Sequence, residues 1–78
     1  MNPRSPRVTA SEVIRGLEKL GYELVRQSGS HKVYRNKAGK RVTVPFHAGN
    51  ILHPKLFKSI LTDIGMTAQE FARLLKKA

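Results

Sequence analysis

The sequence predicts an α+β domain whose elements follow the order helix, three strands and two helices. Three observations favour this class. An amphipathic segment with a helix-start signal opens the chain, three short strand-like stretches follow it, and two more amphipathic segments close it. A three-stranded antiparallel sheet has two faces, so we expect the helices on one face and an open, polar surface on the other.

The first helix is predicted within residues 8–21. Thr9 and Glu12 have the spacing of a capping box, in which each residue satisfies a free amide of the first turn. One apolar stripe runs along it, made by Val13, Ile14, Leu17 and Leu20. Residues 1–7 hold two prolines and no apolar period, so we expect a flexible basic tail there and a single domain over residues 8–78.

Three strands are predicted next, over "YELVRQ" (22–27), "HKVYRN" (31–36) and "KRVTVP" (40–45), with a turn at "NKAG" (36–39). A second helix is predicted over residues 54–64, with Pro54 in its first position and Gly65 at its end. Thr67 and Glu70 repeat the capping-box spacing. They predict an extra C-terminal helix over residues 68–78.

Charge is the first indication of function. Fifteen Lys and Arg residues oppose five Asp and Glu residues, which gives a net charge of +10. No acidic residue occurs from Leu24 to Thr62. A central segment of one sign attracts polyphosphate, so we predict contact with nucleic acid, and RNA suits a basic open sheet face. The alternative is a basic protein whose charge serves only solubility. The candidate RNA-binding residues are Arg26, Lys32, Arg35, Lys37, Lys40 and Arg41.

Composition also excludes several classes of protein. The chain has no cysteine, which rules out disulfides and thiolate metal sites. No more than two apolar residues occur in succession, so neither a transmembrane helix nor a signal peptide is predicted. These features predict a cytoplasmic protein that makes no membrane contact.

The histidine in "SGSHKVYR" (28–35) is the candidate for catalysis. Side chains alternate along a strand, so His31, Val33 and Arg35 share one face, and Lys32 and Tyr34 share the other. Because Arg35 prefers water, we expect His31 on the open face.

His47 follows the third strand, and the hairpin brings the far ends of strands two and three together. We therefore expect the segment from Pro45 to His47 to lie near His31, with cations around both histidines. Histidine titrates near neutral pH and serves as a general acid or base. With the RNA 2′-hydroxyl as nucleophile, such a residue cleaves RNA without a metal or another cofactor.

Other chemistries have weaker support in the sequence. The three histidines, His31, His47 and His53, could bind a metal, but no carboxylate or cysteine joins them. Ser28 and Ser30 could be nucleophiles, but no aspartate-oriented triad is visible. A helix-turn-helix would need a further recognition helix after the C-terminal one. A binding module that grips RNA and cuts nothing fits the composition as well as an enzyme does.

Residues Leu17 to Phe71 resemble the HicA toxin family, also called YcfA-like. The shared motifs are Leu20-Gly21-Tyr22, Gly29-Ser30-His31, Pro45-Phe46-His47 and Ile60-Leu61. The resemblance implies a double-stranded-RNA-binding-like fold and an endoribonuclease that cleaves mRNA. It also implies that the protein is the toxin of a toxin–antitoxin pair and is neutralised by a HicB-type antitoxin. In this family the catalytic histidine corresponds to His31. Ser30 and His47 are candidates for catalytic support.

Overall fold

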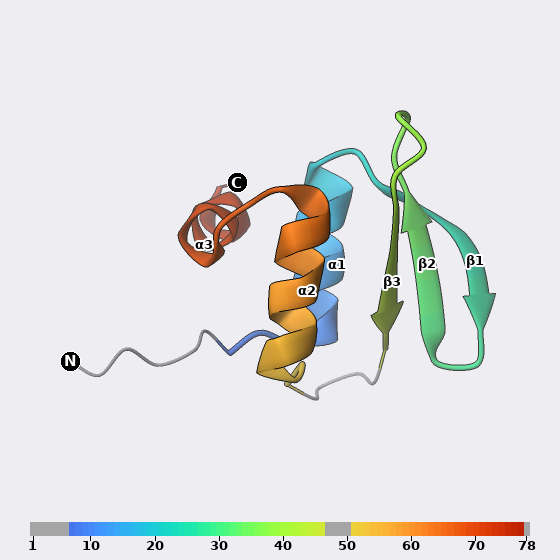
Figure 1. The fold of residues 1–78 in the computed structure, drawn as a ribbon, viewed down its shortest axis with the longest axis horizontal. Coiled ribbons are helices and arrows are strands. Elements are labelled where there is room, and N and C mark those ends of the chain that lie inside the picture. The colour runs from blue at the N-terminus through green and yellow to red at the C-terminus, as the bar shows by residue number, and fades with distance from the viewer. Residues whose placement is uncertain (1–6, 47–50, 78) are drawn as a thin grey trace.

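The predicted order of elements is confirmed by the computed structural model, which describes residues 7–46 and 51–77. Helix α1 (Ala10–Lys19) precedes strands β1 (Glu23–Ser28), β2 (His31–Arg35) and β3 (Arg41–Pro45). Helices α2 (Pro54–Ile64) and α3 (Ala68–Lys76) follow (Figure 1). The α2 bounds match the prediction, and the strand bounds differ from it by one residue. None of the helices in the described residues is long and apolar enough to span a membrane.

The three strands form one antiparallel sheet in the order β1-β2-β3. Gly29 and Ser30 make the tight turn between β1 and β2, where Gly29 has a φ of 57° that favours glycine. The pairing of β1 with β2 shifts between Leu24 and Arg26, which leaves Val25 as the extra residue of a β-bulge. The pairing of β2 with β3 is regular.

The helices begin where their capping residues predict. The Thr9 hydroxyl accepts the Glu12 amide at 3.1 Å, and the Glu12 carboxylate accepts the Thr9 amide at 2.9 Å. Thr67 and Glu70 make the same reciprocal pair at the start of α3. The segments that enter α1 and α2 lie side by side, since the Leu52 amide donates to the Val8 carbonyl at 2.7 Å.

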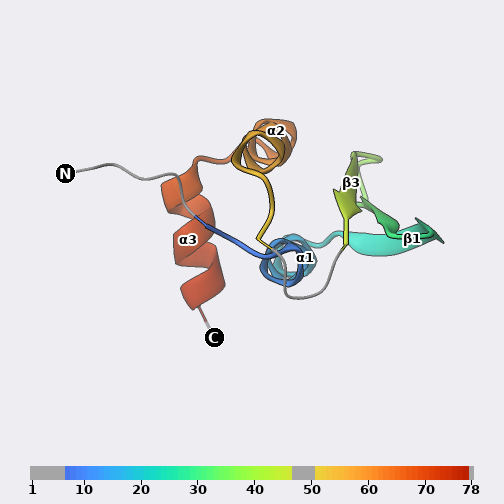
Figure 2. The same ribbon diagram turned by 90° about the horizontal axis from the view of Figure 1, so that it is seen from below.

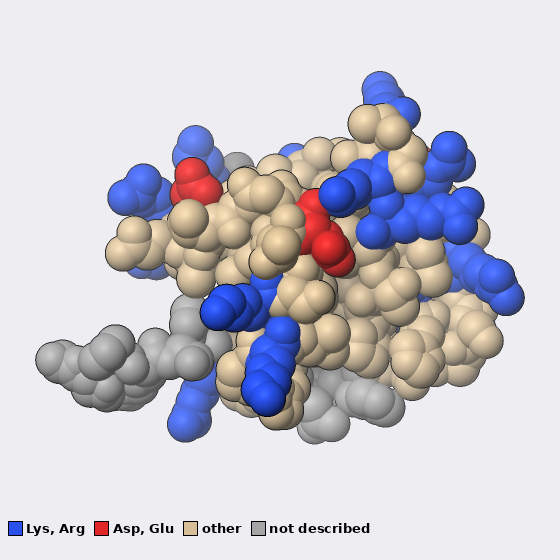
Figure 3. All heavy atoms as spheres, in the orientation of Figure 1, with Lys and Arg blue, Asp and Glu red and all other residues tan. Residues whose placement is uncertain are grey.

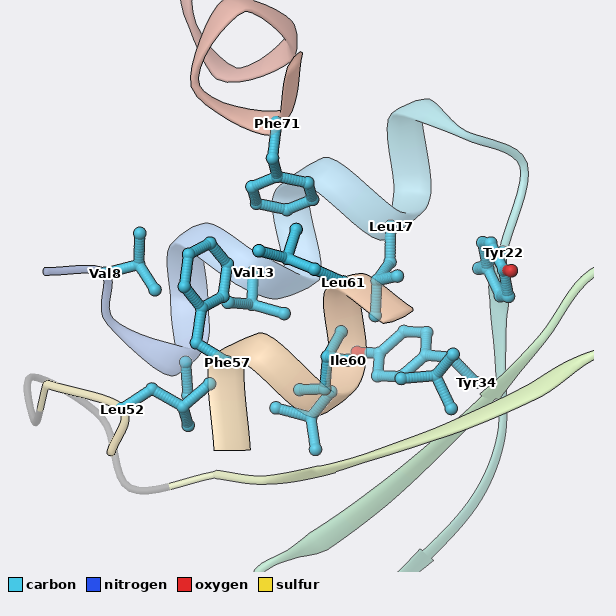
Figure 4. Packing of buried hydrophobic residues seen from close by; sticks show 13 residues of the cluster. Val8, Val13, Leu17, Tyr22, Tyr34, Leu52, Phe57, Ile60, Leu61 and Phe71 are labelled. Carbon is cyan, nitrogen blue, oxygen red and sulfur yellow. The ribbon is translucent and has the colours of Figure 1, made fainter. Parts of the chain in front are cut away.

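The helices lie to one side of the sheet, next to β3, and β1 extends beyond them (Figure 2). The core draws Tyr34, Val42 and Val44 from strands β2 and β3 and closes with side chains from all three helices (Figure 4). Strand β1 contributes no buried residue, and its Leu24 and Val25 are 46% and 51% exposed. The helices therefore cover only the β2–β3 part of the sheet face that we expected them to cover.

One aromatic side chain of α3, Phe71, packs against both α1 and α2. Phe71 is 1% exposed and packs edge-on against Phe57, with ring centroids 5.7 Å apart. Its ring lies over Gly16, where an added Cβ would fall 2.2 Å from the ring carbon Cζ. Because Phe71 is enclosed, the ring has no room to withdraw. This packing therefore requires glycine at position 16.

Gly16→Ala should destabilise the protein, although alanine is the better helix former. The gain in helix propensity is about 1 kcal/mol, and overpacking costs ~1–3 kcal/mol. Because the enclosed ring cannot withdraw, we expect a cost of ~2–3 kcal/mol and a net loss of roughly 1–2 kcal/mol. Urea unfolding measures this loss. In a Phe71→Leu background the same substitution should cost less, because the clashing ring carbons are gone. A Gly16→Ala variant as stable as the parent would contradict the contact.

Candidate active site on the open face of the sheet

Tyr34 determines which side chains face away from the helices. It is 3% exposed, points from β2 toward the helices (Figure 4), and lies opposite Val42 of β3. Side chains alternate along a strand, so every second residue of β2, starting from His31, points away from the face that carries Tyr34. His31, Val33 and Arg35 therefore lie on the open face, as predicted.

Cross-strand pairs assemble the open face in three rows, because directly opposed residues share a face. The first row is Ser28, His31 and Pro45, the second is Arg26, Val33 and Thr43, and the third is Glu23, Arg35 and Arg41. The first row lies beside the β1–β2 turn and the third beside the β2–β3 turn. Arg35 is four positions after His31, so the two ends of the face are about 13 Å apart.

His31 is exposed beside the β1–β2 turn, with Ser28 and Pro45 as its direct neighbours. The Ser30 carbonyl accepts the Phe46 amide, which ties this turn to the end of β3. The expected proximity of Pro45 to His31 is confirmed by this pairing. His47, the other half of that prediction, lies outside the described residues.

The β-bulge brings Arg26 onto the same face as His31. In a regular ladder Val25 would oppose Val33, and Arg26 would face the helix side with Lys32. The extra residue instead sets Arg26 opposite Val33, diagonal to both His31 and Arg35. Diagonal neighbours are roughly 7–8 Å apart, within reach of an arginine side chain. The only signal of this shift in the sequence is the apolar pair Leu24-Val25, which breaks the alternation.

The remaining predicted RNA-binding residues are not gathered around His31. Lys32 faces the helix side, where its ammonium lies 4.0 Å from the centre of the Phe46 ring. Lys and Arg side chains gather at the opposite end of the sheet (Figure 3). The exposed cations at that end are Arg35, Lys37, Lys40 and Arg41. The expected cluster of cations is therefore divided, with Arg26 nearest His31 on its face.

His53 has a local structural role. Its Nδ1 atom accepts the Lys55 amide at 3.1 Å, and the residue is the N-cap of α2. Within residues 7–46 and 51–77, no group of three His, Cys, Asp or Glu side chains is arranged to hold a metal. His53 thus provides a histidine away from the sheet that can serve as a control for His31.

Comparison with known proteins identifies the family. A family model described as the HicA toxin of bacterial toxin-antitoxin matches residues 10–66, which include α1, the whole sheet and α2. The chain belongs to the HicA toxin family. A search of the curated proteins finds no match. As a HicA protein, the chain is the toxin of a toxin–antitoxin system, and toxins of this family generally cleave mRNA.

The HicA motifs take distinct places in the structure. Gly29-Ser30-His31 forms the β1–β2 turn and the first residue of β2, and Pro45-Phe46 closes β3 beside it. Leu20-Gly21-Tyr22 ends α1, while Ile60 and Leu61 are buried in α2. The first two motifs therefore meet at one end of the open face. The last contributes packing.

The buried phenol of Tyr34 makes the stability of this protein depend on pH. Burial raises the pKa of Tyr34 above its ordinary value of 10.0, and the Glu18 carboxylate raises it further. A raised folded-state pKa contributes stability that is fully present below the unfolded-state pKa of about 10. This stability is lost as the pH rises from there through the folded-state pKa. Urea titrations at pH 8 and about 10.5 should show a smaller loss for Tyr34→Phe than for the parent. An equal loss in both proteins would place the alkaline sensitivity elsewhere.

Proposed function

We propose that this HicA protein is a metal-independent endoribonuclease that cleaves mRNA on the open face of its sheet, with His31 as general acid or base. The observation that carries the proposal is the first row of that face. It combines an exposed imidazole with a tight turn, and Arg26 of the second row lies on the diagonal to His31. Family membership supports the toxin role, and it implies that the protein acts in the cytoplasm, where mRNA is found.

The chemistry needs one proton acceptor, one proton donor and a cation. As a base, His31 takes the proton of a 2′-hydroxyl, whose oxygen then attacks the adjacent phosphorus. The bond from phosphorus to the 5′-oxygen breaks, and that oxygen takes a proton from an acid. The products are a 2′,3′-cyclic phosphate and a 5′-hydroxyl. As an acid, His31 would protonate the 5′-oxygen instead, and Ser30 or His47 would assist at the other position.

Arg26 is the residue on this face best placed to stabilise the phosphorane. Charge develops on the non-bridging oxygens as the phosphorus becomes five-coordinate, and a guanidinium can donate to two of them. Lys32 cannot serve from the helix side of the sheet without leaving the Phe46 ring. The more distant cations, Arg35, Lys37, Lys40 and Arg41, hold other phosphates and position the strand.

His31→Ala should leave folding intact and reduce cleavage. The side chain is exposed, so the melting temperature should hardly change. RNA cleavage should fall by about 10²–10⁴-fold, the usual contribution of a positioned acid or base. His53→Asn is the matched control, because it removes an imidazole but retains a side chain that caps α2. Both rates are measured with labelled RNA in excess chelator, which should leave the parent rate unchanged.

The outcomes of this experiment separate the candidates. If His31→Ala folds normally and cuts at the parental rate, His31 is not catalytic, and His47→Ala becomes the next variant. If the parent binds RNA and cleaves none, the protein is an RNA-binding module of the same fold. A parental rate that chelator abolishes would contradict the metal-independent mechanism.

RNA affinity should depend strongly on salt. If ~4 phosphates of a single strand are contacted, the logarithm of the binding constant should fall with the logarithm of salt concentration at a slope near −3. Arg26→Ala should make this slope shallower by about 0.7, the value of one phosphate contact. Lys58→Ala removes a cation from α2 and should leave the slope unchanged. A flat titration would contradict phosphate recognition.

A HicB-type antitoxin should neutralise the toxin by covering the open face. The face carries three arginines against one glutamate in its rows, so the covering surface should be acidic. We expect the purified complex to show no cleavage at low salt, and high salt to weaken the complex. Undiminished cleavage by a complex that stays intact would exclude occlusion as the mechanism.

A further inference from the structure

A hollow of about 270 Å³ lies at the end of the sheet farthest from His31. It is lined by Gly21, Glu23, Val25, Arg35, Asn36 and Lys37. Glu23 and Arg35 are cross-strand partners in the third row, so the hollow adjoins the open face. Its lining combines an apolar surface at Val25, two cations, a carboxylate and a carboxamide, which is the mixture that a nucleotide requires.

The third row also contains a pairing that costs stability in the free protein. Arg35 and Arg41 are directly opposed on β2 and β3, and like charges in that position repel. Glu23 opposes Arg35 on its other side, so the three charged side chains of the row carry a net charge of +1. An anion bound at this end would remove the repulsion, so the row indicates a phosphate site that is separate from His31.

We propose that this hollow is a second subsite, which binds one nucleotide of the RNA away from the bond that is cut. This inference rests on the proposed function. Arg35 and Lys37 hold the phosphate, and the base lies against Val25. Arg26, diagonal to both His31 and Arg35, contacts the backbone between the two subsites.

The polar groups of the hollow favour bases that carry an amino group. A carboxylate only accepts hydrogen bonds, so Glu23 pairs with an exocyclic amine of adenine, guanine or cytosine. Uracil has no amino group, and its single donor on that edge, N3–H, lies between two carbonyl oxygens that repel the carboxylate. The Asn36 Oδ1 atom already accepts the Lys40 amide at 2.9 Å, which holds the carboxamide at the rim of the hollow. Its Nδ2 group carries the donors for a ring nitrogen or carbonyl of the base.

Geometry sets the length of RNA that reaches both subsites. The open face is about 13 Å long between His31 and Arg35. A stacked strand rises ~3.4 Å per nucleotide and an extended strand roughly twice that, so the subsites are about two to four nucleotides apart. A dinucleotide therefore occupies one subsite at a time, whereas an octanucleotide occupies both.

Binding of non-cleavable RNA tests the subsite independently of catalysis. With 2′-O-methyl oligonucleotides, the octamer should bind about 10–100-fold more tightly than the dimer. Arg35→Ala should lower that ratio, because it removes one of the two cations that hold the phosphate. Lys58→Ala, which removes a cation from α2, should preserve it. Equal ratios in the two variants, or no advantage of length in the parent, would overturn the proposal. Cleavage assays play no part, so this failure is distinct from failure of the proposed function.

Base preference tests the assignment of Glu23. The parent should bind 2′-O-methyl octa-adenylate more tightly than octa-uridylate, by roughly 5–150-fold if the contact is a good one. Glu23→Gln should reduce this ratio, because an amide can also donate to uracil. Glu18→Gln removes an exposed carboxylate from α1 and should leave the ratio as it is. A ratio that is the same in all three proteins would exclude base reading in the hollow.

Discussion

The packing of Tyr34 against the helices is the constraint on which the open face depends. Its ring, with Val42 and Val44 of β3, forms the part of the core that the sheet supplies. Once Tyr34 is buried, the two-residue period of the strand places His31 and Arg35 on the opposite, open face. A slip of one residue would bury these two polar side chains and expose Tyr34. Burial of Tyr34 on one face of the strand thus determines the orientation of the proposed catalytic histidine on the other face.

The bulge at Val25 modifies what this alternation would otherwise produce. By adding one residue to β1, it turns Arg26 from the helix side to the open face, where it stands between His31 and Arg35. Because β1 lies beyond the helices, this insertion displaces no buried side chain. An exposed strand can accept such a change at little cost in packing. A strand buried on one face could not.

Helices α1, α2 and α3 form a scaffold on the side of the molecule opposite the open face. Capping residues set where the helices start, and side-chain packing holds them together. Capping boxes start α1 and α3, and the ring of Phe71 over Gly16 holds these helices together. The C-terminal end of α3 is held in turn by Lys19, whose ammonium donates to the Leu74 carbonyl at 3.1 Å. The HicA match ends at residue 66, so this docked helix lies outside the part that defines the family. Strands β2 and β3 rest on the scaffold, and the open face is left free for a ligand.

The sequence by itself determined the elements, their order and the side on which His31 lies, because these follow from caps, turns and periodicity within a few residues. It also predicted the family, which the HicA match over residues 10–66 confirms. Only the tertiary structure decided the register of β1, the position of Lys32 beside Phe46 and the separation of His31 from the third-row arginines. Each of these depends on which residues oppose one another across strands, or on which rings are near. Charge counted along the chain therefore predicted one cationic cluster, whereas strand pairing divided it between two ends of the sheet.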